Sequence, residues 1–173
     1  MGITRRVLVL FGIVLAGAGA ELSQQHGGVL KPGDGERLPG ERRTFVKASP
    51  QTGTQGAEMF RDTMPPGTST GVHVHHQADE FFYVVSGKGL ALVDGTELPV
   101  EADDIVFVPR GHDHRVKSSG PAPLELVFLV DRPGLASDFR EGRSSAIAKK
   151  RRLTLDERNR ISEKYGTTHK TIE

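Results

Sequence analysis

Three histidines and two acidic residues lie within the ten positions 71–80 of a chain that has seven histidines in all. On a β-strand, side chains two positions apart point to the same face, so His73 and His75 would present two imidazoles side by side. Glu80 lies five positions beyond His75, and this odd spacing would place it on the other face of one continuous strand. We therefore expect a turn over 76–79 and a second strand that begins at Glu80 beside the first.

A second polar cluster, PRGHDH at 109–114, also lies at a tight turn that opens an expected strand. A fourth ligand from this cluster would complete a site of three imidazoles and one carboxylate. Such a set suits one divalent transition metal, either manganese, iron, nickel, copper or zinc. On an octahedral metal it would leave two positions for substrate. Because the chain has no cysteine, a thiolate site, a disulfide and a cysteine nucleophile are excluded.

The stretch that carries these clusters predicts an all-β domain. Short apolar runs alternate with turn signals, and Asp94-Gly95 is typical of a tight hairpin. These features predict a small antiparallel barrel or sandwich. The expected strands are Thr44–Ala48, Gly56–Thr63, Gly71–His75, Glu80–Ser86, Leu90–Val93, Thr96–Val100, Ile105–Val108, His114–Ser118 and Leu124–Asp131.

Three of these runs, at 81–85, 105–108 and 127–130, are apolar on both faces. A lone two-sheet sandwich would show one polar face. We therefore expect the outer face to be covered by the N-terminal arm, by the C-terminal helix or by a second subunit. The last alternative predicts a homodimer.

The two polar clusters together resemble the motifs of the cupin superfamily. The first motif, G-x5-H-x-H-x4-E-x6-G, is matched by Gly67, His73, His75, Glu80 and Gly87. The second, G-x5-P-x-G-x2-H-x3-N, is matched by Pro109, Gly111 and His114. It departs from the pattern at Asp103, where glycine is usual, and at Ser118, where asparagine is usual. The resemblance covers roughly residues 55–131.

The resemblance implies an all-β, double-stranded β-helix (jelly-roll) cupin barrel with a metal inside and a short C-terminal α-helix. Carried over residue by residue, the implied metal ligands are His73, His75, Glu80 and His114. Glu80 is also the candidate catalytic residue, as a proton acceptor. Asp79 is the rival carboxylate, but the spacing of the motif favours Glu80.

The other histidines have less specific positions. His76 and His112 are expected to be neighbours of the site rather than ligands, and His112 is a candidate pocket residue. His26 and His169 lie in the tails and are expected to be solvated.

Three further side chains are candidates for a substrate pocket. Phe82 lies two positions beyond Glu80 on the same strand face, and Phe60 would come from a neighbouring strand; the alternative role of both is core packing. Arg110 would meet an anionic substrate, or else lie exposed in its turn.

Three functions remain open from the sequence. The first is a mononuclear metal-dependent dioxygenase that acts on a small organic molecule, as in the flavonol- and diketone-cleaving members that the chain resembles. The second is a non-oxidative Lewis-acid enzyme, namely an isomerase, lyase or decarboxylase. The third is a non-catalytic cupin that binds a small molecule or a sugar.

The first twenty residues have the pattern of a secretory signal peptide. MGITRR carries two arginines, and the fourteen residues that follow are apolar and end in an A-x-A site. We expect cleavage after Ala20, or alternatively after Ala18, and export to the periplasm or the cell exterior with no stable membrane span. The alternative is an uncleaved anchor, although the run is short for a span of about 20 residues. Thr4-Arg5-Arg6 also resembles a twin-arginine signal.

The rest of the chain divides by composition. Residues 21–43 are rich in glycine, proline and charge, which predicts a flexible arm. The barrel is expected over 44–135. Residues 136–173 are expected to form a basic linker and the C-terminal helix.

The helix is predicted by a capping box in which Thr154 is the N-cap and Glu157 the third helical residue. It should run to about Tyr165 and stop at Gly166. The basic run 149–152 before it is interpreted as a solvated linker rather than a nucleic-acid patch, because no aromatic side chains are interleaved with it. The net charge of +1 gives the chain no overall bias toward nucleic acid.

Overall fold

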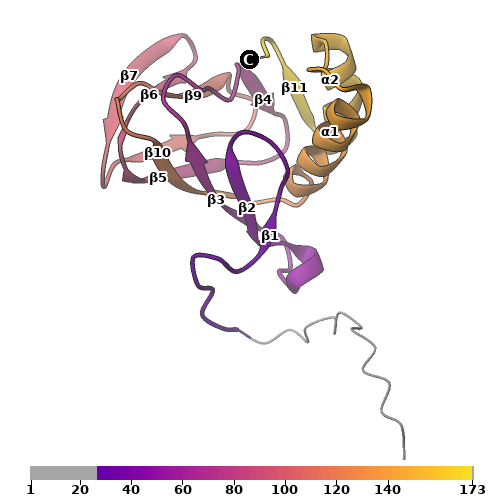
Figure 1. Ribbon diagram of the computed structural model, residues 1–173, viewed down its shortest axis with the longest axis horizontal. Coiled ribbons are helices and arrows are strands. Elements are labelled where there is room, and N and C mark those ends of the chain that lie inside the picture. The colour runs from indigo at the N-terminus through magenta and orange to yellow at the C-terminus, as the bar shows by residue number, and fades with distance from the viewer. Residues whose placement is uncertain (1–26, 173) are drawn as a thin grey trace, which may run out of the picture.

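The computed structural model describes residues 27–172, so the expected signal peptide and His26 lie outside the described residues. Two β-sheets are stacked face to face, and two helices close one side (Figure 1). One sheet has the order β1 (Glu36–Arg37), β2 (Arg43–Ala48), β3 (Glu58–Met64), β10 (Leu124–Val130), β5 (Glu80–Ser86) and β8 (Ile105–Val108). The other has the order β11 (Thr167–His169), β4 (His73–His75), β9 (His114–Ser118), β6 (Lys88–Val93) and β7 (Thr96–Glu101).

The core lies between the two sheets. Along β10 every second side chain is buried, as expected for a strand with one face inward. Phe128 on β10 stacks on Phe60 of β3, with ring centroids 4.7 Å apart. All the strand pairs are antiparallel. This two-sheet sandwich confirms the predicted all-β fold, and three strands, 80–86, 105–108 and 114–118, have the expected bounds.

The expected position of Glu80 relative to β4 is wrong in one respect. Glu80 does begin β5, but β5 does not lie beside β4: β5 pairs with β8 and β10, whereas β4 pairs with β9 and β11. The segment 76–79 therefore crosses from one sheet to the other. Glu80 approaches His73 and His75 across the interior of the sandwich rather than along one sheet.

Helix α1 (Leu135–Lys149) occupies most of the segment that was expected to be a basic linker. Its pocket-facing residues recur at the spacing of one helix face. They are Leu135, Asp138, Phe139, Gly142, Arg143 and Ala146. The structure thus has two C-terminal helices, and α1 closes the open side of the sandwich (Figure 1).

Helix α2 (Leu155–Ser162) has the predicted capping box. The backbone N–H of Glu157 donates to the hydroxyl of Thr154, and the carboxylate of Glu157 accepts from the backbone N–H of Thr154. The 3₁₀ turn η2 (Glu163–Tyr165) follows, and Gly166 ends it with a φ of 76°. Strand β11 comes next, and it was not expected. Neither helix among the described residues is both long enough and apolar enough to span a bilayer.

A buried ion pair joins the two helices. The guanidinium of Arg158 on α2 donates to both carboxylate oxygens of Asp138 on α1, each at 2.7 Å. Ser162 also donates to Asp138. Because Asp138 is fully buried, this pairing fixes the position of α1 over the site.

The described part of the N-terminal arm contacts the sheet at several points. Strand β1 pairs with β2, and Leu38 is fully buried in the core. The ammonium of Lys47 donates to the carbonyl oxygens of Lys31, Pro32 and Asp34. A short 3₁₀ turn, η1 (Pro50–Thr52), follows β2.

The outer face of β5 and β8 is apolar and open. Phe81, Tyr83, Ile105 and Phe107 are between 39% and 68% exposed. Neither the described part of the arm nor the helices cover these side chains. The homodimer therefore stays a prediction.

Candidate metal centre

Four side chains from three strands meet inside the sandwich. His73 and His75 come from β4, His114 comes from β9 in register with His73, and Glu80 comes from β5 across the interior. All four are buried, and one potential ligand atom from each lies within 4.8 Å of the others. The structure therefore brings together the four implied ligands.

Hydrogen bonds on the outer ring nitrogens orient the three imidazoles. Nδ1 of His73 lies 3.0 Å from the carbonyl oxygen of Gly71, and Nδ1 of His114 lies 3.1 Å from that of His112. Because a carbonyl oxygen only accepts, each Nδ1 carries a proton and donates it. The Nε2 lone pair of His73 is then free for a metal, which is the arrangement typical of metal-ligating histidines. Nε2 of His114 instead donates to Oε2 of Glu80 at 2.8 Å, so this ring would bind a metal after losing that proton.

His75 is oriented by a residue from the C-terminal segment. Its Nδ1 lies 2.8 Å from the hydroxyl of Thr167 on β11. Its Nε2 is buried and makes no hydrogen bond among the described residues, although it lies 3.2 Å from Oε2 of Glu80. A buried polar atom without a hydrogen bond is costly, and a metal ion would satisfy it. The donor set of three nitrogens and one oxygen thus fits a divalent transition metal.

The charges of the cluster are coupled. Burial alone would raise the pKa of Glu80, but the neighbouring His75 and His114 outweigh burial and hold it well below its usual range. Burial, with His114 and His75 close by, lowers the pKa of His73 far below 6.5. Burial opposes protonation of His114, yet its 2.8 Å hydrogen bond to Glu80 raises its pKa overall. The cluster therefore supplies one carboxylate anion and one clearly neutral imidazole at neutral pH.

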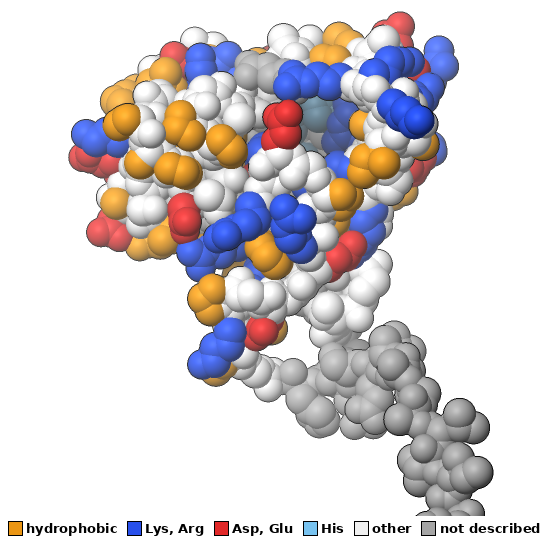
Figure 2. All heavy atoms as spheres, in the orientation of Figure 1, with side chains coloured by type: hydrophobic (Ala, Val, Ile, Leu, Met, Phe, Trp, Pro, Cys, Tyr) orange, Lys and Arg blue, Asp and Glu red, His pale blue; other side chains and the backbone are white. Residues whose placement is uncertain are grey.

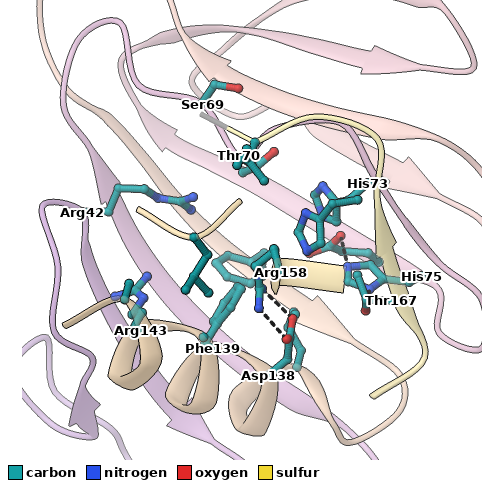
Figure 3. A pocket seen from close by; sticks show the side chains of 18 of the residues that line it. Arg42, Ser69, Thr70, His73, His75, Asp138, Phe139, Arg143, Arg158 and Thr167 are labelled. Carbon is teal, nitrogen blue, oxygen red and sulfur yellow. Dashed lines mark hydrogen bonds and ion pairs between the residues drawn. The ribbon is translucent and has the colours of Figure 1, made fainter. Parts of the chain in front are cut away.

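A cavity of about 300 Å³ opens onto the cluster (Figure 3). This volume is at the lower end for small-molecule sites. Phe82 lines it, as expected for one of its two candidate roles. Phe60 does not line it, and is fully buried in the core behind Phe128.

The remaining candidates lie outside this cavity. Arg110 is 43% exposed and forms ion pairs with Asp79 and Asp131. These contacts hold Asp79 away from the cluster and lower its pKa to about 2. His112 is half-exposed, and its ring forms a hydrogen bond with Asp94. Its backbone carbonyl accepts the hydrogen bond from Nδ1 of His114. Nε2 of His76 bonds to the hydroxyl of Thr168 at the surface.

His169 was expected to be solvated, and this expectation is wrong. Strand β11 pairs with β4 and places His169 opposite His73, with their rings stacked at 5.4 Å between centroids. The side chain lines the cavity, and both ring nitrogens are buried without a hydrogen-bond partner among the described residues. Burial lowers its pKa to about 3. His169 is thus a neutral imidazole that faces the site from the C-terminal segment.

Comparison with known proteins finds a family match in the central part of the chain. Residues 60–130 match the cupin domain family. The chain is 32% identical over 75 residues to the oxalate-binding protein of Thermotoga maritima, a match that covers 43% of this chain and 62% of the relative. It is also 32% identical over 94 residues to the tetracenomycin polyketide synthase protein TcmJ of Streptomyces glaucescens, covering 54% of this chain and 62% of the relative. The chain thus spans less than two thirds of each of these relatives.

Solved structures agree on the fold. A predicted oxalate decarboxylase from Thermotoga maritima is 28% identical with a TM-score of 0.51, and the match covers 54% of this chain and 82% of that one. KdgF from Halomonas sp. is 17% identical with a TM-score of 0.56, covering 64% of this chain and 99% of that one. At this identity the second likeness shows the fold alone.

Proposed function

Because residues 60–130 form a cupin domain around a buried three-histidine, one-glutamate cluster, we propose that the protein is a metal-dependent enzyme that oxidises a small organic molecule with dioxygen. The supporting observation is the position of the cluster in the wall of a largely apolar cavity. Its apolar wall would limit the water around the reacting groups once a substrate fills it. The bound metal would supply redox chemistry with dioxygen.

The residues of the chain have distinct roles in this proposal. His73, His75 and His114 would hold the metal through Nε2, and Glu80 would hold it through a carboxylate that stays ionised. Glu80 would also act as the proton acceptor for a substrate in the cavity. His169 would form a hydrogen bond with that substrate, because its ring nitrogens have no other described partner.

A second candidate is non-oxidative Lewis-acid chemistry on a small organic acid. It is favoured by two matches from Thermotoga maritima, a sequence described as an oxalate-binding protein and a solved structure described as a predicted oxalate decarboxylase. The same cluster and cavity would serve this chemistry. The name of the first relative is equally consistent with binding alone.

One experiment separates these alternatives. The protein would be loaded in turn with manganese, iron, nickel, copper and zinc, and its metal content measured. Oxygen uptake and substrate loss would then be followed for a panel of small organic acids and diketones. Oxygen uptake coupled to substrate loss supports the dioxygenase. Anaerobic turnover supports the second candidate, and saturable binding without turnover under every metal supports a binding protein.

The control is a His75→Ala variant, which should lose the metal and all metal-dependent turnover. Retention of one metal per chain in this variant would contradict the ligand assignment. We further propose that the enzyme acts after export. N-terminal sequencing of protein from the native compartment should begin at residue 21, or at 19 if the alternative site is used.

A further inference from the structure

The wall of the cavity opposite the cluster is positively charged. Four arginines line the cavity, against two carboxylates, Glu80 and Asp138. The arginines are Arg42, Arg143, Arg152 and Arg158. In Figure 3, Arg42 and Arg143 lie on the side of the pocket away from His73 and His75. A metal at the cluster would add to this excess of positive charge.

Two of the four arginines are neutralised within the protein. Arg158 forms its bidentate ion pair with Asp138, and Arg42 forms an ion pair with the fully buried Asp62. These pairs position the side chains and leave little net charge for a ligand. The excess of charge therefore rests on Arg143 and Arg152.

Arg143 is a partly buried guanidinium that has no carboxylate at ion-pair distance among the described residues. Its two terminal nitrogens donate to neutral acceptors, the carbonyl oxygen of Pro39 and the hydroxyl of Thr44, each at 2.8 Å. The guanidinium also lies over the ring of Phe139, 5.5 Å from its centroid. These contacts fix the orientation of the charge without neutralising it.

The environment of Arg143 is unfavourable for an isolated cation. Burial, together with the charge of Arg42, lowers the pKa of Arg143 to about 10. Asp62, which Thr44 links to Arg143 and which is already paired with Arg42, offsets only part of this effect. A desolvated charge that is only partly compensated is costly in free energy, and a bound anion would relieve that cost. Arg143 is therefore poised to gain from an anionic ligand.

Arg143 also lies at the entrance of the cavity. An outer groove of about 740 Å³ shares Arg42, Arg143 and Arg152 with the cavity, so the arginines stand where the two spaces meet. Figure 2 shows a histidine at the bottom of a hollow that is bordered by basic side chains. Lys150, Arg151 and Glu41 also line the outer groove, and Arg151 is paired with Glu157, so these residues add little to its net charge.

From these observations we propose that the cavity takes a small organic anion, with a carboxylate or a phosphate bound by Arg143. The apolar body of this ligand lies against Phe82, Phe128 and Phe139, and its other end reaches the histidine–glutamate cluster. This inference rests on the proposed function for its substrate role, but the anion contact itself is independent of metal and of turnover.

The test is calorimetric binding of three probes to the full chain. The probes are benzoate, phenyl phosphate and the neutral benzamide, all of which present an aromatic ring. Binding is measured on the wild type, on Arg143→Gln and on Arg143→Lys, with metal content and the thermal midpoint recorded for each. The matched control is Arg140→Gln, which removes the same charge from the same helix at a position bound to Glu36 outside the cavity.

We expect the wild type to bind one of the two anions in preference to benzamide. Because charge-assisted hydrogen bonds are among the stronger ones, Arg143→Gln should weaken the binding of that anion by about 10- to 100-fold. Arg143→Lys should retain part of the affinity, and Arg140→Gln should resemble the wild type. Preference for benzoate or for phenyl phosphate identifies which anion the site takes.

Three results would overturn the inference: no anion binding by folded wild type at millimolar probe, equal affinity for benzamide and the anions, or undiminished anion binding by folded Arg143→Gln. The His75→Ala variant separates this inference from the proposed function. Loss of metal with an intact effect of Arg143 supports the inference even if no metal-dependent turnover exists. If the protein binds metal and turns over substrate but substitution of Arg143 does not change anion affinity, the proposed function is supported and the inference is refuted.

Discussion

The hydroxyl of Thr167 can accept the Nδ1 proton of His75 in the tautomer that metal binding needs. Thr167 is buried, and its Oγ1 lies 2.8 Å from Nδ1 of His75. In a Thr167→Val variant the side chain keeps its shape and β-branching but loses this acceptor. In the metal-bound state, Nδ1–H of His75 would then be buried without a partner.

The metal-free state has a way to avoid this cost. Without metal, His75 can carry its proton on Nε2 and face Oε2 of Glu80, which lies 3.2 Å away. The penalty therefore falls on the metal-bound state. A buried unsatisfied donor costs about 1–3 kcal/mol, which corresponds to a loss of metal affinity of about 5- to 150-fold. In other metal sites, loss of a residue that orients a ligand lowers metal affinity by about 10- to 100-fold, which agrees with this range.

The assay is competition for the metal with a chromophoric chelator, accompanied by thermal unfolding of the metal-free proteins. The control is Thr168→Val on the same strand, which removes a surface hydrogen bond to His76. We expect weaker metal binding in Thr167→Val only. Wild-type affinity in Thr167→Val, or an equal loss in Thr168→Val, would refute the role assigned to Thr167.

Three further predictions concern the C-terminal segment and the outer face. A His169→Phe variant should keep one metal per chain but lose substrate affinity and turnover, because it retains the stack on His73 and loses the ring nitrogens; loss of metal content would instead make His169 a ligand. The pKa of Glu157 is depressed below 4.5 by Arg151 first and then by its other partners, so Glu157 stabilises the fold above pH 4.5 and this contribution is lost as the pH falls. Glu157→Gln should melt lower at neutral pH, with a difference that shrinks in acid, and a difference independent of pH would be inconsistent with this reasoning. Light scattering at micromolar concentration should show a dimer, and Ile105→Lys should disrupt it by placing a charge on the exposed apolar face. A monomeric wild type would count against the hypothesis that a second subunit covers this face.

The barrel and the cluster were predictable from the sequence because their signals are local. Alternation along the strands, the turn at Asp94-Gly95 and the two spaced motifs each lie within a few residues. The sheet partners of β5 were not predictable from spacing, since an odd separation of His75 and Glu80 is compatible with a turn within one sheet or a crossing between two. Only pairing between distant strands distinguishes these arrangements.

Helix α1 was missed because its buried face is not uniformly apolar. Asp138, Gly142 and Arg143 lie on that face among apolar residues, and each has a partner or a role that the sequence does not show. Asp138 is neutralised by Arg158, and Gly142 leaves room for that same guanidinium, since a Cβ there would lie 2.6 Å from its Nη1. The role of His169 was hidden for a related reason, because β11 is only three residues long and depends on pairing with β4.

The pairing of β11 with β4 also sets an order of assembly. The four ligand candidates belong to residues 73–114, whereas the hydroxyl that orients His75 lies 92 residues after it in the chain. During synthesis from the N-terminus the ligands emerge well before that hydroxyl. A barrel without its C-terminal segment would hold all four candidate ligands but would leave Nδ1–H of His75 without this acceptor, and its cavity would lack Arg143 and His169. The contacts proposed to support metal binding and anion recognition thus both depend on the C-terminal segment, so a chain that lacks this segment should have little capacity for either.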